Sequence, residues 1–306
     1  MPILECDAWR EQYFAGIECP DHVVVPTDDP ESWRLFPEQR WVYNKLLICA
    51  SQGIEHGPHG VEPAHFPVFS KPIYNMRGMG TGSRVLHSPG ELHAALSPGH
   101  MWMRLLRGEH VSSDVVIEGG HAHWWRHAQG ESFGSGIFDY WTVLADARPA
   151  LERSLATWIS RHLAGYTGMA NFETIGGAII ECHLRFSDQW PDLYGGAEWI
   201  RAVVCLYEGK GWRYDDEQRR TGYSVVLWGA HGTRYRPPSS RTVERVLARE
   251  GVSSVQITFD PDKPAAEHAM PPGGFRLAIV NAWTLDAGRE GRDVLSAEIL
   301  GSGNAL

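Results

Sequence analysis

The sequence predicts an α+β fold in which helices cover antiparallel sheets. Segments with strand character follow one another between residues 101 and 145 and are separated by glycine-containing turns, a pattern typical of an antiparallel meander. Elsewhere helices and strands interleave without a regular βαβ repeat. A glycine turn at Gly176-Gly177, inside NFETIGGAIIECHLRF (171–186), predicts one more hairpin.

In the first third of the chain we expect a short strand at 22–26 and a helix from about Glu38 to Ala50. The stretches VFSKPIY (68–74) and SRVL (83–86) are predicted to pair as a hairpin joined by a glycine-rich loop. A helix is expected over 88–96, because a serine cap is followed by proline in the first turn and by glutamate at the third helical position.

The rest of the chain alternates between the two kinds of element. Strands are predicted by β-branched and aromatic runs at 101–106, 110–119, 121–129, 137–145, 223–229, 255–260 and 275–284. Helices are predicted by apolar residues at helical spacing at 148–166, 197–209, 241–250 and 288–300.

Composition limits the classes of protein to consider. The 306 residues are 43% hydrophobic and 21% charged, as in a globular protein with a substantial core. No apolar run reaches the ~20 residues of a membrane span. The N-terminus lacks a basic-then-apolar signal pattern, so we expect a cytoplasmic protein without a membrane partner.

The cysteine count and the net charge exclude further classes. Five cysteines without a CxxC pair argue against a disulfide framework and against a thiolate zinc site. The formal net charge of −9 argues against nucleic acid as a general partner, because binding it requires clustered Lys and Arg.

The predicted hairpin at 171–186 carries an unusual set of charges. Glu181, His183 and Arg185 share one strand face, and Glu173 is expected close to opposite Glu181. Two facing acids destabilise a sheet unless a cation joins them, and Mg²⁺ takes carboxylate and phosphate oxygens together. The alternative is a solvated pair neutralised by the arginine. The apolar flanks AII and LRF favour a buried strand.

A second set of residues lies in KPIYNMRGMGTGSR. Lys71 ends a strand, and the following turn contains Gly78, Gly80, Gly82 and Ser83. Glycines let backbone N–H groups approach phosphate oxygens, and a lysine adds a point charge. The order differs from a Walker loop, and the turn leads to a strand rather than to a helix, unlike a dinucleotide fingerprint. A flexible turn is the simpler alternative.

Taken in order, these pieces resemble the ATP-grasp superfamily over about residues 40 to 190. FPVFSKPIYNMRGMGTGSRVLHSPGEL resembles its lysine strand, glycine loop and helix, MWMRLLRGEHVSSDVVIEGG its hinge strand and G-x-E element, and GYTGMANFETIGGAIIECHLRF its acidic hairpin. The resemblance implies two α+β subdomains whose antiparallel sheets clasp a nucleotide. It suggests a reduced N-terminal region (1–44), a small subdomain with the glycine-rich lid (45–100) and a large subdomain with a C-terminal extension (101–306).

The resemblance also implies roles for single residues. ATP contacts would come from Lys45, Lys71, Gly78, Gly80, Gly82, Ser83, Met101, Trp102, Met103, Arg104 and Glu109. Metal ligands would be Glu173, Glu181 and His183, although His183 stands where the family usually has asparagine. Catalytic contacts would come from Lys71, His183 and Arg185. Apart from the resemblance, substrate contacts are expected from Arg77, Asp139, Ser187 and Asp188. A satisfied acid in a core strand is an equal alternative for Asp139, and a capped helix start is the alternative for Ser187 and Asp188.

The activity that the resemblance implies is an ADP-forming ligation. A carboxylate would be activated as an acyl phosphate by ATP with Mg²⁺, or with Mn²⁺ in its place, and then joined to an amine. Small-molecule carboxylates and amines would be the partners, and a homodimer is compatible with the family. The alternatives are an ATP-grasp kinase, a nucleotide-binding module without turnover, and a histidine metalloenzyme centred on His121 and His123.

Overall fold

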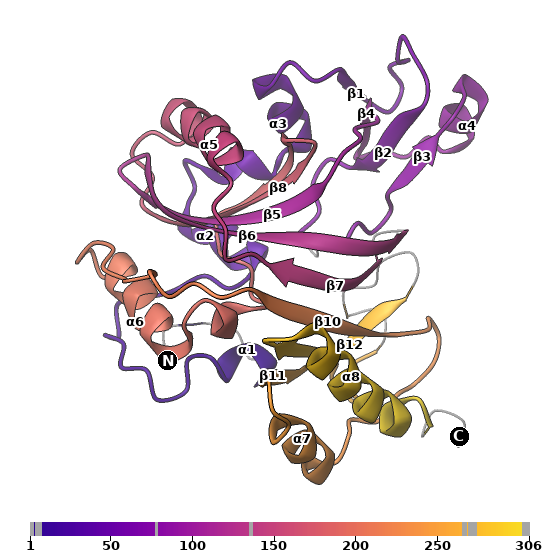
Figure 1. The fold of residues 1–306 in the computed structure, drawn as a ribbon. Coiled ribbons are helices and arrows are strands. Elements are labelled where there is room, and N and C mark those ends of the chain that lie inside the picture. The colour runs from indigo at the N-terminus through magenta and orange to yellow at the C-terminus, as the bar shows by residue number, and fades with distance from the viewer. Residues whose placement is uncertain are drawn as a thin grey trace.

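Two antiparallel sheets organise the chain. The computed structural model describes Ile3, residues 8–76, 79–134 and 137–264, His268 and residues 274–301. A four-stranded sheet projects from one end of a twisted eight-stranded sheet, with helices on the outside of both (Figure 1). The predicted α+β class with antiparallel sheets is therefore confirmed.

The small sheet has the order β1-β4-β2-β3. Its strands are β1 (His56–Pro58), β2 (Val68–Pro72), β3 (Arg84–Leu86) and β4 (His100–Arg104). The predicted pairing of the strands that flank the glycine-rich loop is confirmed, because Ser70 lies opposite Arg84 and Val68 opposite Leu86. The predicted boundary between residues 100 and 101 falls inside β4, which pairs with β1 and β2. By sheet membership the small subdomain therefore extends to Arg104.

The large sheet has the order β11-β12-β10-β7-β6-β5-β8-β9, with every neighbouring pair antiparallel. Its strands are β5 (His110–Glu118), β6 (His121–Gly134), β7 (Ile137–Val143), β8 (Gly168–Ile175), β9 (Ala178–His183), β10 (Gly222–Gly229), β11 (Val252–Ile257) and β12 (Phe275–Ala282). The C-terminal strands thus extend the sheet that carries the acidic hairpin, and they are not a separate unit.

The helices are mostly short. The structure contains α1 (Ala8–Glu11), α2 (Asp29–Leu35), η1 (Arg40–Tyr43), α3 (Lys45–Ser51), α4 (Pro89–Ala94), α5 (Pro149–His162), η2 (Pro191–Leu193), α6 (Gly196–Tyr207), α7 (Ser240–Leu247) and α8 (Leu285–Ile299). The predicted start of α4 is confirmed: the Ser88 hydroxyl accepts from the Glu91 N–H, and Glu91 accepts from the His87 N–H. Among the described helices, none is long and apolar enough to cross a membrane.

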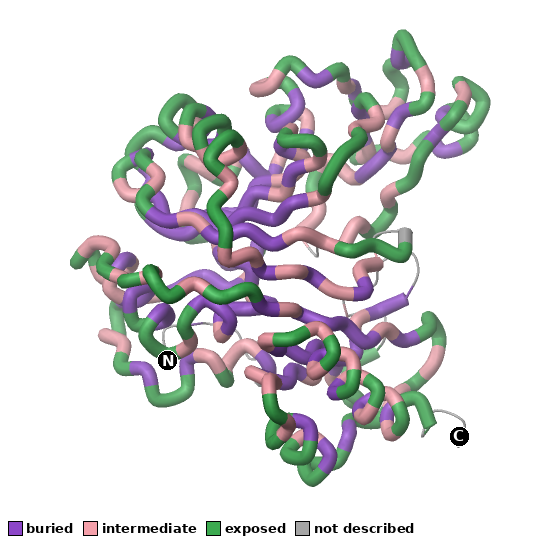
Figure 2. Tube along the Cα trace, viewed as in Figure 1, coloured by how far each residue is buried: buried purple, intermediate pink, exposed green. Residues whose placement is uncertain are grey.

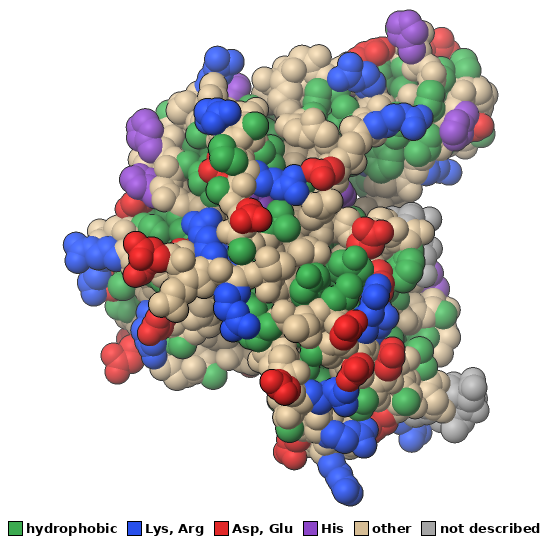
Figure 3. Space-filling view, in the orientation of Figure 1, with side chains coloured by type: hydrophobic (Ala, Val, Ile, Leu, Met, Phe, Trp, Pro, Cys, Tyr) green, Lys and Arg blue, Asp and Glu red, His purple; other side chains and the backbone are tan. Residues whose placement is uncertain are grey.

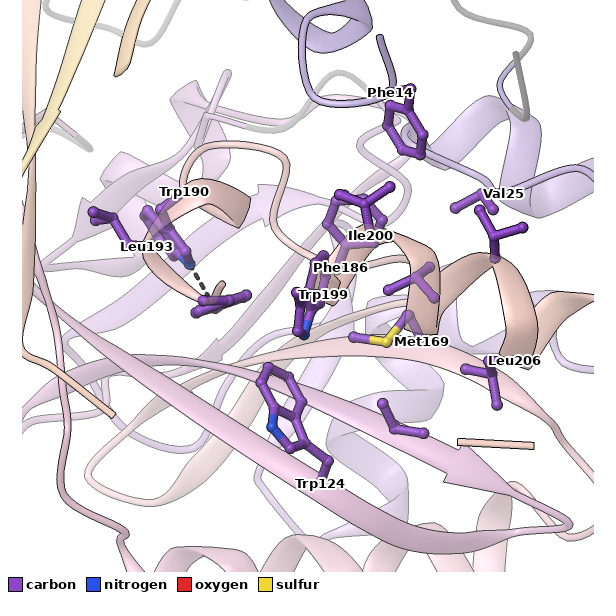
Figure 4. Packing of buried hydrophobic residues seen from close by; sticks show 14 of the residues in the cluster. Phe14, Val25, Trp124, Met169, Phe186, Trp190, Leu193, Trp199, Ile200 and Leu206 are labelled. Carbon is purple, nitrogen blue, oxygen red and sulfur yellow. Dashed lines mark hydrogen bonds between the residues drawn. The ribbon is translucent and has the colours of Figure 1, made fainter. Parts of the chain in front are cut away.

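The period of two along the strands divides the core into two layers. Val115 and Ile117 on β5 pack toward α5, whereas Val116 between them packs toward α6. Buried residues follow the strands of the large sheet, whereas exposed residues lie mainly on the helices and loops (Figure 2). In the α6 layer Trp199 lies between Trp124 and Phe186, and Phe14 of the N-terminal segment closes the cluster (Figure 4).

Three of the predicted elements were wrong in detail. Residues 22–26 form an extended buried segment that pairs with no strand. The helix expected from Glu38 to Ala50 is broken into η1 and α3, because Asn44 adopts an extended conformation and its side chain accepts from the Leu46 N–H to start a new helix. The strand expected at 255–260 begins earlier and ends at Ile257.

Candidate active site

A cavity of about 620 Å³ lies where the small sheet meets the acidic hairpin. Its wall takes residues from β2 and β4, from β5 to β10, from the segment after β9 and from β12. On the outer face shown in Figure 3, acidic and basic side chains are interspersed without a continuous basic patch. The cavity wall likewise contains both signs of charge, with the acidic pair Glu173 and Glu181 on the same wall as several cationic side chains.

Lys71 is the cation at the inner end of the small sheet. It lies on β2, its side chain is buried, and its Nζ donates to the Ile180 carbonyl at 2.9 Å. Burial lowers the pKa of Lys71 to about 8, and the nearby Glu181 charge opposes that shift. Lys71 therefore presents a desolvated ammonium to the cavity, and its attraction for a bound anion is stronger there than it would be in water.

The glycine-rich loop borders the same cavity. Met79, Gly80 and Ser83 line it, and both Met79 and Gly80 have left-handed backbone angles, with φ values of 62° and 61°. Gly82 is also left-handed at φ 76°, but it does not line the cavity. Gly78 and Arg77, which we predicted to contact ATP and substrate, lie outside the described residues.

Glu173 and Glu181 lie directly opposite each other on β8 and β9, because a register shift next to Glu173 moves its partner from Ile180 to Glu181. The turn residues Gly176 and Gly177 both have positive φ, and a bulge follows Glu173. Both acids line the cavity, and so they face inward rather than toward open solvent.

Each acid has a basic partner. His110 Nε2 lies 3.0 Å from a Glu173 oxygen, and Lys45 Nζ lies 3.5 Å from a Glu181 oxygen. Burial favours the neutral acids, but His110 lowers the pKa of Glu173, and Lys45 with His183 holds the pKa of Glu181 well below its usual range. Both carboxylates are therefore ionised at neutral pH.

His183 and Arg185 meet on one buried carboxylate. His183 Nδ1 lies 2.9 Å from Asp29, and Arg185 Nε donates to the other Asp29 oxygen at 3.0 Å. Burial disfavours the imidazolium, yet the Asp29 charge and hydrogen bonds to Asp29 and Glu181 raise the pKa of His183 to about 9. A protonated imidazole has no lone pair for a metal, so this arrangement argues against His183 as a ligand.

The two glutamates fit one kind of metal site. Within the described part of the chain, no three His, Cys, Asp or Glu side chains are grouped so as to hold an ion. A pair of carboxylates suits Mg²⁺, which is usually bound by one or two carboxylates and takes its other oxygens from phosphates and water. Glu173 and Glu181 could therefore hold Mg²⁺ that arrives with a phosphorylated ligand.

The end of β4 and the residues after it form another part of the wall. Met103 and Arg104 line the cavity together with Leu105 and Leu106. Met101 and Trp102 do not: Met101 packs against Cys49 and Ile54, and Trp102 lies in the small-sheet core and donates to the Val61 carbonyl at 2.7 Å. Glu109 lines the cavity, and one of its oxygens accepts from Arg148 at 2.6 Å.

Comparison with known proteins gives a result at the level of the fold. Neither a protein-family model nor a curated protein matches the sequence. Among solved structures, an L-amino acid ligase from Bacillus licheniformis superposes with a TM-score of 0.56 at 15% identity, over 85% of this chain and 71% of that chain. The chain has the ATP-grasp fold.

Two further structures show the same ATP-grasp architecture. A carboxyaminoimidazole ribonucleotide synthase from Aspergillus clavatus, complexed with ATP, gives a TM-score of 0.59 at 12% identity over 85% of this chain and 74% of that chain. A phosphoribosylglycinamide synthetase from Anaerococcus prevotii gives 0.58 at 11% identity over 95% of this chain and 84% of that chain.

The substrate residues expected within the ATP-grasp fold are only partly brought together. Ser187 and Asp188 line the cavity directly after the acidic hairpin. Asp139 does not, because it forms ion pairs with Arg289 and Arg292 on α8 and so joins that helix to β7. Asp139 is thus a buried acid satisfied by its ion pairs, as in the alternative of a core strand, and it lies outside the cavity wall.

The ATP-grasp cavity also contains residues that sequence reasoning missed. His110, Arg10 and Arg276 line it, and Asp29 lies behind it as the partner of His183 and Arg185. The sequence signal at Asp29 was only that of a helix start, because Asp28 caps α2 and proline follows Asp29. Nothing local to Arg10 or Arg276 indicated a site.

The histidine-rich strand lies apart from the ATP-grasp cavity. His121 and His123 are exposed on β6, and His123 Nδ1 lies 3.6 Å from Glu118. His127 is buried between the Ser113 hydroxyl at 2.8 Å and Glu152 at 3.0 Å, so it serves the core. In the part of the chain that the structure describes, no third His, Cys, Asp or Glu completes a metal site there, so the metalloenzyme alternative has no support.

Proposed function

We propose that this chain is an ATP-dependent ligase that activates a carboxylate as an acyl phosphate and joins it to an amine. The observation that supports this proposal is the convergence of Lys71, the Glu173–Glu181 pair and Arg185 on one cavity wall. The structural neighbours include an amino acid ligase and an enzyme complexed with ATP, which fits a nucleotide in the same place.

In the first step a carboxylate oxygen attacks the γ-phosphorus of ATP. The bond between that phosphorus and the β,γ-bridging oxygen breaks, and ADP leaves with the electron pair. Lys71 would hold the phosphates by charge, and Arg185 would face the charge that develops on the transferred group. When bound between the two glutamates, Mg²⁺ would neutralise phosphate charge.

In the second step the amine nitrogen attacks the carbonyl carbon of the acyl phosphate. The carbon–oxygen bond to phosphate breaks, inorganic phosphate leaves, and the nitrogen releases a proton to solvent. The protein contributes position and charge to both steps and forms no covalent bond with the substrate. Asp29 fixes the orientation of His183 and Arg185, so the cationic side of the site is preorganised.

The test uses the whole chain with ATP, Mg²⁺ and pooled carboxylic acids and amines, followed by chromatography of the nucleotides. We expect ADP and phosphate that appear only when both an acid and an amine are present. ADP formed with an acid alone, together with a stable phosphorylated product, would mean a kinase. AMP would contradict the proposed mechanism, and ATP binding without turnover under every mixture would mean a binding module.

Residue variants link this activity to the cavity. Lys71→Ala should lower the rate of ADP formation at least about 100-fold, because a phosphate contact is lost in a desolvated site. Arg249→Gln is the control, since Arg249 is only partly buried, lies outside the cavity wall and pairs with the exposed Glu290 on α8. Unchanged turnover in Lys71→Ala would place the active site elsewhere.

A further inference from the structure

Three guanidinium groups line one part of the cavity, called here the arginine end. Arg10, Arg185 and Arg276 all line it, from α1, from the segment after β9 and from β12. Arg10 Nε lies 2.7 Å from Asp188, and Arg185 is paired with Asp29. Arg10 and Arg185 thus each have a carboxylate partner among the described residues.

Arg276 differs from Arg10 and Arg185 because its direct contacts are with neutral groups. Its Nη1 donates to the Gln189 side-chain oxygen at 3.2 Å, and its guanidinium lies 5.0 Å from the centre of the Trp9 ring. Among the residues that the structure describes, it forms no ion pair within 4.0 Å. Its direct contacts are therefore neutral, and the nearby Asp188 charge acts on it without an ion pair, so the guanidinium can still donate to an anion in the cavity.

The wall beside these arginines is aromatic. Phe138 and Trp141 on β7 and Trp228 on β10 line the cavity, with Val226 next to them. The rings of Phe138 and Trp141 lie 4.4 Å apart. The indole N–H of Trp228 already donates to the Phe138 carbonyl at 2.9 Å, so what this side chain offers a ligand is its apolar surface.

We propose that this end of the cavity binds a small aromatic carboxylic acid, with Arg276 contacting the carboxylate and Phe138, Trp141 and Trp228 packing against the ring. The proposal rests on the proposed ligase function, because the bound acid would be the carboxylate that ATP activates. An aromatic ammonium ion is disfavoured here, since the surrounding guanidinium groups repel a cation.

The position of the pocket agrees with that use. Contacts run in sequence from Glu181 to His183 at 3.5 Å, from His183 to Asp29 at 2.9 Å and from Asp29 to Arg185 at 3.0 Å. The arginine end and the acidic pair are thus two ends of one network. A phosphate ester is the other anion that a guanidinium would recognise, and the aromatic wall argues for the acid.

The test measures binding by calorimetry and ADP release with three probes: 3-phenylpropionate, propionate and ribose 5-phosphate. We expect 3-phenylpropionate to bind at least tenfold more tightly than propionate, and ribose 5-phosphate to bind no better than propionate. Equal binding of 3-phenylpropionate and propionate, or tighter binding of ribose 5-phosphate, would overturn the proposal.

Variants of Arg276 and Trp228 test the contribution of the guanidinium charge and that of the aromatic wall separately. Arg276→Gln should weaken 3-phenylpropionate at least tenfold with ATP binding unchanged, while Arg276→Lys should restore part of the loss. Trp228→Leu should remove the preference for the ring and leave propionate unaffected. An Arg276→Gln variant that binds 3-phenylpropionate like the wild type would contradict the assignment.

The failure of this proposal is distinguishable from failure of the ligase function. If ADP release requires an acid without an aromatic ring and the three probes bind equally well, the ligase function stands but the aromatic pocket is ruled out. Absence of ATP binding would remove the ligase function itself. Arg249→Gln again serves as the control for a loss of positive charge outside the cavity.

Discussion

Glu173 and Glu181 face each other across β8 and β9, and each carboxylate has a basic partner from a different part of the chain. His110 on the neighbouring strand β5 contacts Glu173, whereas Lys45 at the start of α3 contacts Glu181. The two contacts differ in one important way: the Lys45 side chain is buried, whereas the His110 side chain is partly exposed to solvent.

Glu181→Gln is therefore expected to cost more stability than Glu173→Gln. Loss of Glu181 leaves the buried Lys45 ammonium without its carboxylate, at a cost of about 3 kcal/mol. Loss of Glu173 removes a hydrogen bond to the partly exposed His110, which water can replace, at a cost of about 1 kcal/mol. Urea denaturation measures both, and the Lys45→Met/Glu181→Gln double variant should recover part of the larger loss. Equal losses in the two single variants would contradict this account.

Nucleotide affinity should depend on pH through Lys71. Because burial lowers the pKa of Lys71 to about 8, the ammonium is present below that pH and is lost as the pH rises through it. ATP affinity should be flat below pH 7 and fall above pH 8, by up to about tenfold per pH unit. Lys71→Arg, which keeps its charge, should remove this dependence in calorimetric titrations. The same slope in both proteins would show that another group is responsible.

Asp29 should contribute to stability at neutral pH and lose that contribution in acid. Burial raises its pKa, but Arg185 and His183 lower it further, to about 2. The contribution is complete above about pH 4, is lost as the pH falls through 2, and amounts to ~2 kcal/mol. Asp29→Asn should cost about 3 kcal/mol at pH 7, because two buried cations lose their carboxylate.

The neighbouring Asp28 supplies the control for Asp29. Its side chain accepts from the Glu31 N–H at 2.7 Å and caps α2, so Asp28→Ala should cost about 1 kcal/mol. Acid denaturation should be altered by the Asp29 change and left close to wild type by the Asp28 change. Similar acid profiles for both variants would mean that Asp29 is not specially stabilised.

Gly108 joins the segment after β4 to the turn of the acidic hairpin. Its φ is +128°, and an added Cβ would lie 2.7 Å from the Gly176 Cα. Gly108→Ala should therefore destabilise the protein by about 3 kcal/mol and weaken ATP binding, because the hairpin turn must move. Gly119→Ala is the control: its φ is +57°, and an added Cβ would have no atom within 4 Å. We expect it to lower the free energy of unfolding by only about 1 kcal/mol, as measured by thermal melting. Equal melting temperatures would contradict the close contact.

The sequence by itself determined the local geometry of the hairpin. A two-residue glycine turn starts the hairpin, and the period of two places His183 on the same face as Glu181. The exact pairing of Glu173 with Glu181 also needs the bulge beside Glu173, which the turn does not dictate. The same reasoning predicted that Lys71 ends a strand beside the glycine-rich loop. These features depend on residues close in sequence, whose backbone geometry follows from residue type.

The tertiary structure decided which groups meet at the site. Asp29 pairs with His183 across 154 positions, and no pattern around Asp29 distinguishes a buried partner from an ordinary helix start. Arg276 reaches the cavity only because β12 pairs with β10, which in turn pairs with β7. Such contacts arise when the sheet assembles, because strand order between distant segments is set by packing of the whole core and not by local propensity.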